Sequence, residues 1–270
     1  MSATDKVFAG SVPKLYDEYL VPLIFSVYAE DMARRVAALS PASLLEIAAG
    51  TGAVTRAVAA TLPADVRYVA TDLNEPMLAV AQQRQGEDPR MSWRHADALA
   101  LPFDDAAFDL VCCQFGAMFF PDRTKGYAEA KRVLKRDGTY LFSVWDRIED
   151  NVFANDATIT LGKMFPDDPP LFMARTPHGY HDKAVIRADL ERAGFGDISI
   201  ETLSATSRAP TAEYVAIAYC QGTPLRGEIE ARDASKLQAA TDAVAEAIRT
   251  RHGLGPVEAK IQALVVTARR

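Results

Sequence analysis

Short apolar runs alternate with helix-like segments along most of the chain. The apolar runs have the length and the β-branched content of strands, and the segments between them suit helices. Strands are predicted from residue 43 and at 66–72, 91–95, 108–116, 139–145, 198–207 and 257–267. Helices are predicted at 13–19, 23–39, 53–62, 75–85, 127–134, 154–165, 183–193, 212–220 and 227–251. This alternation with short connections is typical of an α/β protein with a parallel sheet wound on both faces.

The first predicted strand ends in a turn of small residues. Gly50 and Gly52 stand in this turn, directly before the helix that is predicted from Ala53. Glycine adopts backbone angles that a side chain forbids, and its missing Cβ lets a ligand lie against the main chain beside the helix N-terminus. The turn therefore predicts a nucleotide-like binding site, although a plain tight connection has the same pattern.

An acid ends the second strand. Asp72 lies 22 residues beyond Gly50, and in a doubly wound sheet the end of the second strand sits beside the glycine turn. A carboxylate there can accept hydrogen bonds from both hydroxyls of a ribose. The alternative is that Asp72 caps the following helix, a role that Asn74 also suits.

Polar side chains end the next two strands as well. Asp97 follows the third strand, where its carboxylate can accept from an adenine amino group while the amide of Ala98 donates to a ring nitrogen. Gln114 closes the fourth strand with a polar tip. Met77, in the first turn of the helix after Asp72, lies against an adenine or fills the core.

Charge and composition narrow the function classes. The chain has 270 residues, 49% of them hydrophobic, which is enough to bury a core, and a net charge of -6 that disfavours nucleic acid as the primary partner. The sequence shows no signal-peptide pattern and no apolar run of the roughly 20 residues that span a bilayer, so we expect a cytoplasmic protein. The three cysteines show no CxxC spacing and are expected to pack in the core.

Two further groups of residues are candidates for the site. Tyr16 and Tyr19, in the aromatic N-terminal segment, either pack its helices onto the core or close over a ligand at the glycine turn. In the polar cluster at 177–182, His178, Tyr180 or His181 could orient or deprotonate an acceptor. The alternative is a solvated loop whose Asp182 caps the next helix, and no metal site is predicted there.

Five motifs in order carry a family resemblance. They read LEIAAGTG at 45–52, ATDLNEPML at 70–78, ADALALPF at 96–103, FDLV at 108–111 and EAKRVLKRDG at 129–138. The sequence resembles the class I S-adenosylmethionine-dependent methyltransferases, within them the type 11 group that includes the ubiquinone/menaquinone C-methyltransferases. It departs from many of them in Glu46, where Asp is common, and in Ala49, where Cys is common. A dehydrogenase is the weaker interpretation, because the third glycine of the dinucleotide fingerprint is missing.

The resemblance implies a Rossmann-like, doubly wound and mostly parallel seven-stranded sheet whose last strand is antiparallel to its neighbours. It also implies N-terminal helices and a helical insertion before the last strand. We expect a single domain over 1–270, with a helical lid at 1–40, a cofactor-binding core at 42–146 and acceptor-side insertions at 147–182 and 208–255.

The implied cofactor is S-adenosyl-L-methionine, with S-adenosyl-L-homocysteine as product. By similarity, Glu46 and the main chain at 48–52 hold the methionine part, Asp72 the ribose, and Leu73 with Met77 the adenine face. Asp97 and Ala98 take the adenine edge, and Gln114 with Phe115 lie near the methyl group. With the two tyrosines, the expected cofactor-binding residues are Tyr16, Tyr19, Glu46, Ala48, Ala49, Gly50, Thr51, Gly52, Asp72, Leu73, Met77, Asp97, Ala98, Gln114 and Phe115.

The expected reaction is methyl transfer to carbon or oxygen of a small, partly apolar molecule. The Asn-Pro-Pro-Tyr motif that amine-directed nucleic-acid methyltransferases carry is missing, which disfavours methylation of a base nitrogen. The alternatives are a protein that binds the cofactor without transferring a methyl group, and a methyltransferase acting on protein or RNA. The sequence leaves the oligomeric state open, a homodimer included.

Overall fold

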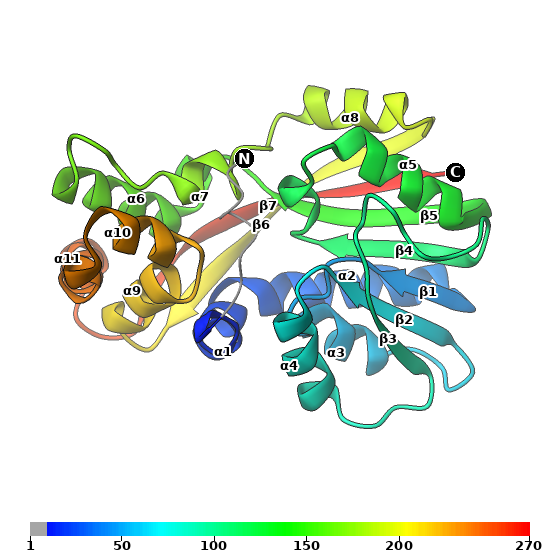
Figure 1. Ribbon diagram of the computed structural model, residues 1–270, viewed down its shortest axis with the longest axis horizontal. Helices are drawn as coiled ribbons and strands as arrows, with labels where there is room; N and C mark the ends of the chain where they lie inside the picture. The colour runs from blue at the N-terminus through cyan, green and yellow to red at the C-terminus, as the bar shows by residue number, and fades with distance from the viewer. Residues whose placement is uncertain (1–9) are drawn as a thin grey trace. The chain divides into compact units, whose positions relative to one another are not determined.

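The computed structural model describes residues 10–270, and its elements are labelled in Figure 1. The part of the predicted N-terminal lid that falls on residues 1–9 lies outside the described residues. The chain forms two compact units. The helical unit comprises Met1–Phe25, of which residues 10–25 are described, Trp145–Gly179 and Ser204–Gln262. The sheet unit comprises Ser26–Val144, Tyr180–Leu203 and Ala263–Arg270.

The sheet unit contains most of the strands and the helices between them. Its elements are α2 (Ser26–Leu39), β1 (Ser43–Glu46), α3 (Ala53–Ala59), β2 (Arg67–Asp72), α4 (Glu75–Gln85), β3 (Met91–His95), β4 (Phe108–Gln114), the 3-10 helix η3 (Ala117–Phe119), α5 (Arg123–Val133), β5 (Leu134–Trp145, up to Val144) and α8 (Lys183–Arg192).

The helical unit begins with α1 (Val12–Leu15) and the π-helix η2 (Tyr16–Phe25). It continues with η4 (Ile148–Asp150), α6 (Val152–Met164), α7 (Phe172–Arg175), α9 (Ala212–Gln221), α10 (Leu225–Asp233), η5 (Ala234–Lys236) and α11 (Leu237–His252). Two long strands, β6 (Asp197–Ala209) and β7 (Val257–Arg269), have residues in both units.

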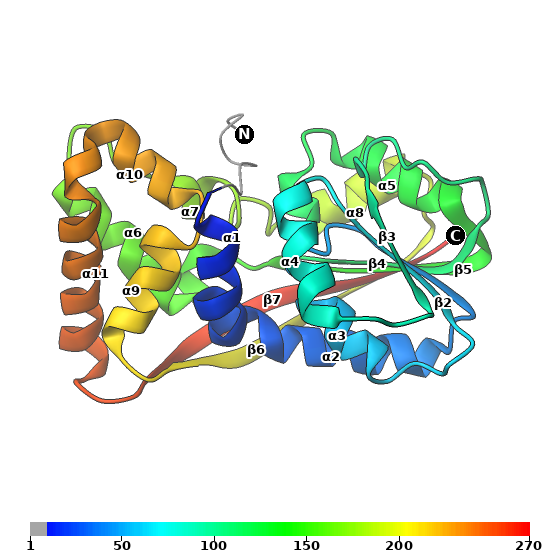
Figure 2. The same ribbon diagram turned by 60° about the horizontal axis from the view of Figure 1, so that its bottom comes forward.

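The seven strands form one sheet in the order β3-β2-β1-β4-β5-β7-β6. The pairings from β3 to β5 are all parallel, and several of these strands are seen side by side in Figure 2. The Arg270 amide donates to the Gly138 carbonyl, and the Asp146 amide to the Gln262 carbonyl. Because partner numbers fall along β7 as they rise along β5, these two strands are antiparallel. The predicted mostly parallel, seven-stranded sheet is confirmed, together with its reversed last strand.

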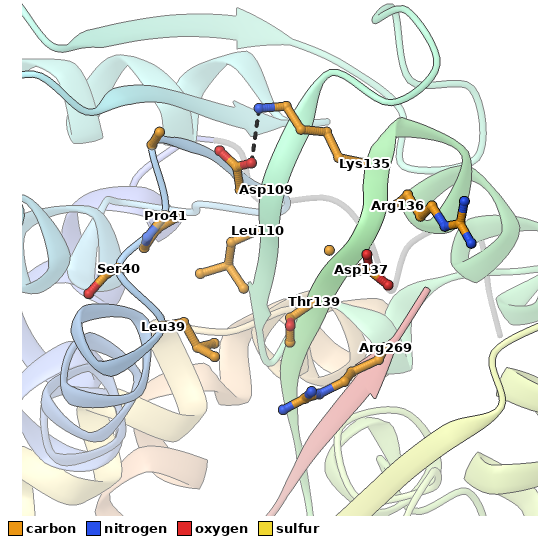
Figure 3. A pocket seen from close by; sticks show the side chains of 12 residues that line it. Leu39, Ser40, Pro41, Asp109, Leu110, Lys135, Arg136, Asp137, Thr139 and Arg269 are labelled. Carbon is orange, nitrogen blue, oxygen red and sulfur yellow. Dashed lines mark hydrogen bonds and ion pairs between the residues drawn. The ribbon is translucent and has the colours of Figure 1, made fainter.

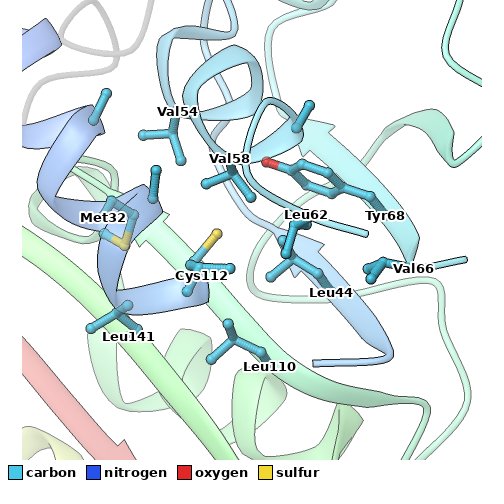
Figure 4. Close-up of a cluster of buried hydrophobic side chains, with 14 of the residues drawn as sticks. Met32, Leu44, Val54, Val58, Leu62, Val66, Tyr68, Leu110, Cys112 and Leu141 are labelled. Carbon is cyan, nitrogen blue, oxygen red and sulfur yellow. The ribbon is translucent and has the colours of Figure 1, made fainter. Parts of the chain in front are cut away.

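Helices cover both faces of the sheet in the sheet unit. On one face, residues of α2 and α3 pack with alternate residues of β1, β2, β4 and β5, such as Leu44, Tyr68 and Leu141 (Figure 4). On the other face, Tyr127 of α5 lies 5.2 Å from the Phe142 ring, centroid to centroid. Neighbouring residues of β5 thus point to opposite faces, as a strand requires. The three cysteines are buried and unbridged, as predicted.

The structure differs from the predicted elements most clearly at the following places. The N-terminal helices do not separate at 20–22, since η2 passes Pro22 as a π-helical run and leads directly into α2. The strand predicted at 139–145 already begins at Leu134, and the register of β5 against β4 jumps from Leu134 to Thr139. The single helix predicted at 227–251 is broken at Asp233, whose carboxylate accepts from the backbone amide and hydroxyl of Ser235.

A single arginine fixes the loop between β3 and β4. The guanidinium of Arg132 on α5 donates to the carbonyls of Leu101 and Phe103, and it pairs with Asp105 and Glu129. This loop carries the predicted adenine-edge residues at its start, so the position of the loop bears on the site.

We expect Arg132→Met to lower the free energy of unfolding by about 2 kcal/mol, because two carbonyls and two carboxylates lose a charged donor together. The matched control is Arg136→Met, since Arg136 is exposed and makes no hydrogen bond or ion pair with the described residues. Urea unfolding of both variants measures the difference. Equal midpoints for the two would contradict the anchoring role of Arg132.

Candidate functional site

The turn after β1 holds an unusual run of left-handed backbone. Ala48, Gly50 and Gly52 have φ of 56°, 58° and 82°. Such angles cost little for glycine but strain alanine, and strained residues of this kind cluster at functional sites. The Ala49 amide donates to the Thr71 carbonyl of the adjacent strand, which holds the turn in place. The predicted glycine turn at the carboxyl end of β1 is therefore present.

Thr51 brings a polar group into this turn that the protein does not satisfy. Its side chain is 1% exposed, and its hydroxyl has no hydrogen-bond partner. A buried hydroxyl without a partner costs about 1–3 kcal/mol, so each one in a native protein calls for an explanation.

Asp72 lies directly beside the turn. One carboxylate oxygen accepts from the Gly50 amide at 2.8 Å, and the other accepts from the Asn74 amide at 2.7 Å. Burial raises the pKa of Asp72 above its ordinary value, although both hydrogen bonds act to lower it. The N-cap residue of α4 is Asn74 and not Asp72, so the capping alternative for Asp72 is not what the structure shows.

Glu46, at the end of β1, is engaged inside the protein. The same carboxylate oxygen, Oε2, accepts from the hydroxyls of Thr55 and Tyr68 at 2.6 and 2.5 Å. Burial raises the pKa of Glu46 to about 7, against the lowering effect of these two donors. These partners on α3 and β2 were not predicted from the sequence, because they belong to elements whose faces meet only in the folded sheet.

The predicted adenine residues flank Asp72. Leu73 is 43% exposed, whereas Met77 is buried with its Cε 3.8 Å from where a Cβ on Gly50 would lie. Asp97 is exposed and accepts the Leu99 amide at 2.9 Å, and Ala98 beside it is buried. The carboxyl ends of β1, β2 and β3 thus bring these residues to one edge of the sheet.

The end of β4 packs tightly against the glycine turn. Phe115 has a φ of 52°, and its amide donates to the Ser143 carbonyl on β5. A Cβ on Gly116 would lie only 2.5 Å from the Cβ of Ala48, so these two segments approach at a distance that only glycine allows. The close approach at Gly116 was not predicted from the sequence. The position of this glycine, directly after the polar end of a strand, was a usable signal.

The two histidines fall in different units. His178, in the helical unit, is 4% exposed and its Nδ1 lies 2.8 Å from the Asp146 carbonyl. A carbonyl only accepts, so Nδ1 carries a proton. His181, in the sheet unit, is exposed. Asp182 accepts from the amides of Ala184 and Val185, as the capping alternative predicts, but its solvated loop is wrong for the buried His178.

The aromatic residues of η2 pack within the helical unit. The Tyr16 ring stacks on Phe25 with centroids 5.1 Å apart, and Phe25 lies 5.8 Å from Trp145. Trp145 in turn lies 5.9 Å from the His178 ring, so four rings form a continuous row. Tyr19 contacts Tyr214 instead, at 4.8 Å. The predicted closure of either tyrosine over the glycine turn stays a prediction.

A hollow at the opposite, amino ends of the strands is a weaker candidate (Figure 3). It has a volume of about 410 Å³ and is lined by residues that include Asp109, Lys135, Asp137 and Arg269. Lys135 is paired with Asp109 at 2.9 Å, so its charge is already balanced. Because acids and bases alternate around the hollow, its lining selects no single class of ligand.

Two negative findings hold for residues 10–270. No group of three or more histidine, cysteine or acidic side chains is arranged to hold a metal ion there. None of the helices in that range has both the length and the apolar character that crossing a bilayer demands.

Comparison with known proteins shows which proteins this chain resembles. Residues 45–142 match the family described as "Methyltransferase domain". The demethylmenaquinone methyltransferase of Clavibacter sepedonicus is 42% identical over 105 residues, which are 39% of this chain and 42% of that protein. The enzyme of the same name from Deinococcus radiodurans is 36% identical over 142 residues, covering 50% of this chain and 57% of the relative.

Residues 45–142 form a methyltransferase domain, which resembles that of the class I S-adenosylmethionine-dependent enzymes. The matched segments span only about half the length of these two relatives. Phosphoethanolamine N-methyltransferase 2 of Haemonchus contortus, solved with phosphomonomethylethanolamine and S-adenosylhomocysteine, has a TM-score of 0.64 at 17% identity. The match covers all of this chain and 61% of the Haemonchus contortus chain. At 17% identity, this similarity shows the methyltransferase fold alone.

The raised pKa of Glu46 predicts how the stability of the methyltransferase domain depends on pH. The folded state favours the protonated carboxyl, so this stabilisation is complete below pH 4.5 and is lost as pH rises toward 7. Between pH 5 and pH 8 we expect wild-type protein to lose up to about 3 kcal/mol relative to Glu46→Gln, whose amide does not titrate.

Urea unfolding of the free protein at both pH values measures this difference. The control is Glu191→Gln, because Glu191 is exposed on α8. A gap between wild type and Glu46→Gln that stays constant from pH 5 to pH 8 would show that Glu46 is charged throughout.

Proposed function

We propose that this protein binds S-adenosylmethionine at the carboxyl edge of β1, β2 and β3 and transfers its methyl group to a small, partly apolar acceptor. The observation that carries the proposal is the unsatisfied hydroxyl of Thr51 in a left-handed turn beside the buried carboxylate of Asp72. A nucleoside with an amino-acid tail requires three features of its site. These are a hydrogen-bond donor without a partner, main chain that no side chain covers, and a carboxylate.

The proposed contacts follow the strand ends. Asp72 keeps lone pairs for ribose hydroxyls, because each of its oxygens accepts only one strong backbone bond at present. The exposed Leu73 and the buried Met77 offer the apolar surfaces for an adenine, and Asp97 with Ala98 offers its polar edge. The residues from Ala48 to Gly52 hold the methionine part through their main chain. Glu46, which precedes these residues in the chain, supports them because hydrogen bonds from Thr55 and Tyr68 hold its carboxylate in place.

The methyl donor is a sulfonium, which supplies the reactive carbon when it is bound. The work of this chain is then to align an acceptor and to exclude water. Gln114 and Phe115, at the end of β4, are the proposed residues beside the methyl group. His178, whose ring is oriented by the hydrogen bond from Nδ1 to the Asp146 carbonyl, is the first candidate for a general base, and His181 is the second.

The names of two relatives support an aromatic acceptor. Both are called demethylmenaquinone methyltransferases, so a flat, quinone-like ring is the proposed class of acceptor. A cytoplasmic location and a homodimer stay predictions.

The proposed function is tested by incubating the protein with S-adenosylmethionine and hydroxylated aromatic acceptors, among them 1,4-dihydroxynaphthalene and 3,4-dihydroxybenzoate. Mass spectrometry should detect S-adenosylhomocysteine together with an acceptor that has gained one methyl group. Cofactor binding without product for any acceptor would instead support a binding protein that does not transfer the methyl group.

Thr51→Val tests the cofactor contact separately. Valine keeps the shape and removes the orphaned hydroxyl, so we expect affinity for S-adenosylhomocysteine to fall by about 1 kcal/mol without any loss of stability in the free protein. Thr55→Val is the matched control, because the equally buried Thr55 does bond Glu46 and its loss should destabilise the fold. Unchanged affinity in Thr51→Val, measured by calorimetry, would remove Thr51 from the site.

A further inference from the structure

A second buried hydroxyl at the same edge of the sheet has no partner. Ser143, near the end of β5, is 2% exposed and its Oγ makes no hydrogen bond. Most buried hydroxyls in folded proteins do bond to something. Neither the sequence motifs nor the proposed cofactor contacts account for this serine.

The sheet register places Ser143 on the face that α2 and α3 cover. Leu141, two residues earlier, packs in the cluster with these helices, and alternate residues of a strand share a face. On β4, Cys112 pairs with Leu141 and Gln114 pairs with Ser143. Gln114 and Ser143 are therefore neighbours on one face, at the point where an apolar face becomes polar.

This pair continues the proposed cofactor site along the sheet. The carbonyl of Ser143 accepts the amide of Phe115, and Gly116 beside it packs against Ala48 of the glycine turn. Strands β1, β4 and β5 are successive in the sheet. Since neighbouring strands lie about 4.8 Å apart, Ser143 stands roughly 10 Å across the sheet from β1, which is the span of a small ring system.

We propose that the hydroxyl of Ser143 hydrogen-bonds an oxygen of the methyl acceptor and so selects acceptors that carry a hydroxyl or carbonyl group. A serine hydroxyl both donates and accepts, so it suits either group. On this face its neighbours by register are Leu141 along β5 and Gln114 across on β4. Ser143 is thus a positioning and specificity residue, and this assignment rests on the proposed function.

Stability of the free protein provides the first test. If the hydroxyl of Ser143 is unsatisfied without an acceptor, Ser143→Ala should unfold at the same urea concentration as wild type or at a higher one. Ser43→Ala is the matched control, because Ser43 is also buried in the sheet unit but bonds Asp109 twice, at 2.7 and 3.0 Å. This control should unfold at lower urea. An equal fall in both variants would overturn the proposal.

Binding provides the second test and needs no turnover. Protein saturated with S-adenosylhomocysteine is titrated with 1,4-dihydroxynaphthalene, kept reduced, and with naphthalene, which lacks the two oxygens. Wild type should prefer the dihydroxy compound, and Ser143→Ala should lose about tenfold of that preference while its affinity for naphthalene is unchanged.

The outcomes separate the two proposals. Failure of S-adenosylhomocysteine to bind overturns the proposed function, and this inference with it. If S-adenosylhomocysteine binds normally, two results overturn the role of Ser143 alone. One is an equal preference for the dihydroxy compound in Ser143→Ala and in wild type, and the other is no binding of the dihydroxy compound at all.

Discussion

The carboxylate of Asp72 is the group on which the candidate site depends. It joins the amide of Gly50, in the turn after β1, to the amide of Asn74, at the start of α4. Both hydrogen bonds favour the charged form, while burial opposes it and raises the pKa. The site thus keeps a buried carboxylate that the protein itself stabilises incompletely. A ligand with hydroxyl donors would complete that stabilisation.

The segments that follow β1 and β4 pack closely against each other at the same edge of the sheet. Ala48 and Phe115, which are not glycines, take positive φ angles, and Gly116 permits contact between the segments that carry them. Thr51 and Ser143 each bury a hydroxyl without a partner within the same edge. Strain and unsatisfied polar groups reduce stability, and their presence together at this edge fits a site shaped for ligands.

The sequence predicted the sheet and the position of Asp72 beside the glycine turn well, because both rest on local patterns. Helix α4 and strand β3 have the predicted bounds, and Asp72 lies beside Gly50 because strand ends in a parallel sheet meet at one edge. Relations between distant residues were not predictable in this way. The partners of Glu46, the close approach at Gly116 and the isolation of Ser143 follow from packing across strands.

The errors in the predicted elements have the same origin. The gap predicted between the helices at 13–19 and 23–39 is occupied by the π-helical run of η2, which contains Pro22. Strand β5 begins at Leu134 and not at residue 139, and the helix predicted at 227–251 is interrupted at Asp233. In each case the prediction came from a local sequence pattern. Hydrogen bonds in the folded chain determined the actual bounds.

The central claim is that this edge binds a sulfur-containing adenosine cofactor. Calorimetric titration of the purified protein with S-adenosylmethionine, S-adenosylhomocysteine and NADH side by side tests it most directly. We predict micromolar binding of the first two compounds and none of NADH. Failure of both sulfur compounds to bind, or binding of NADH in their place, would contradict the account.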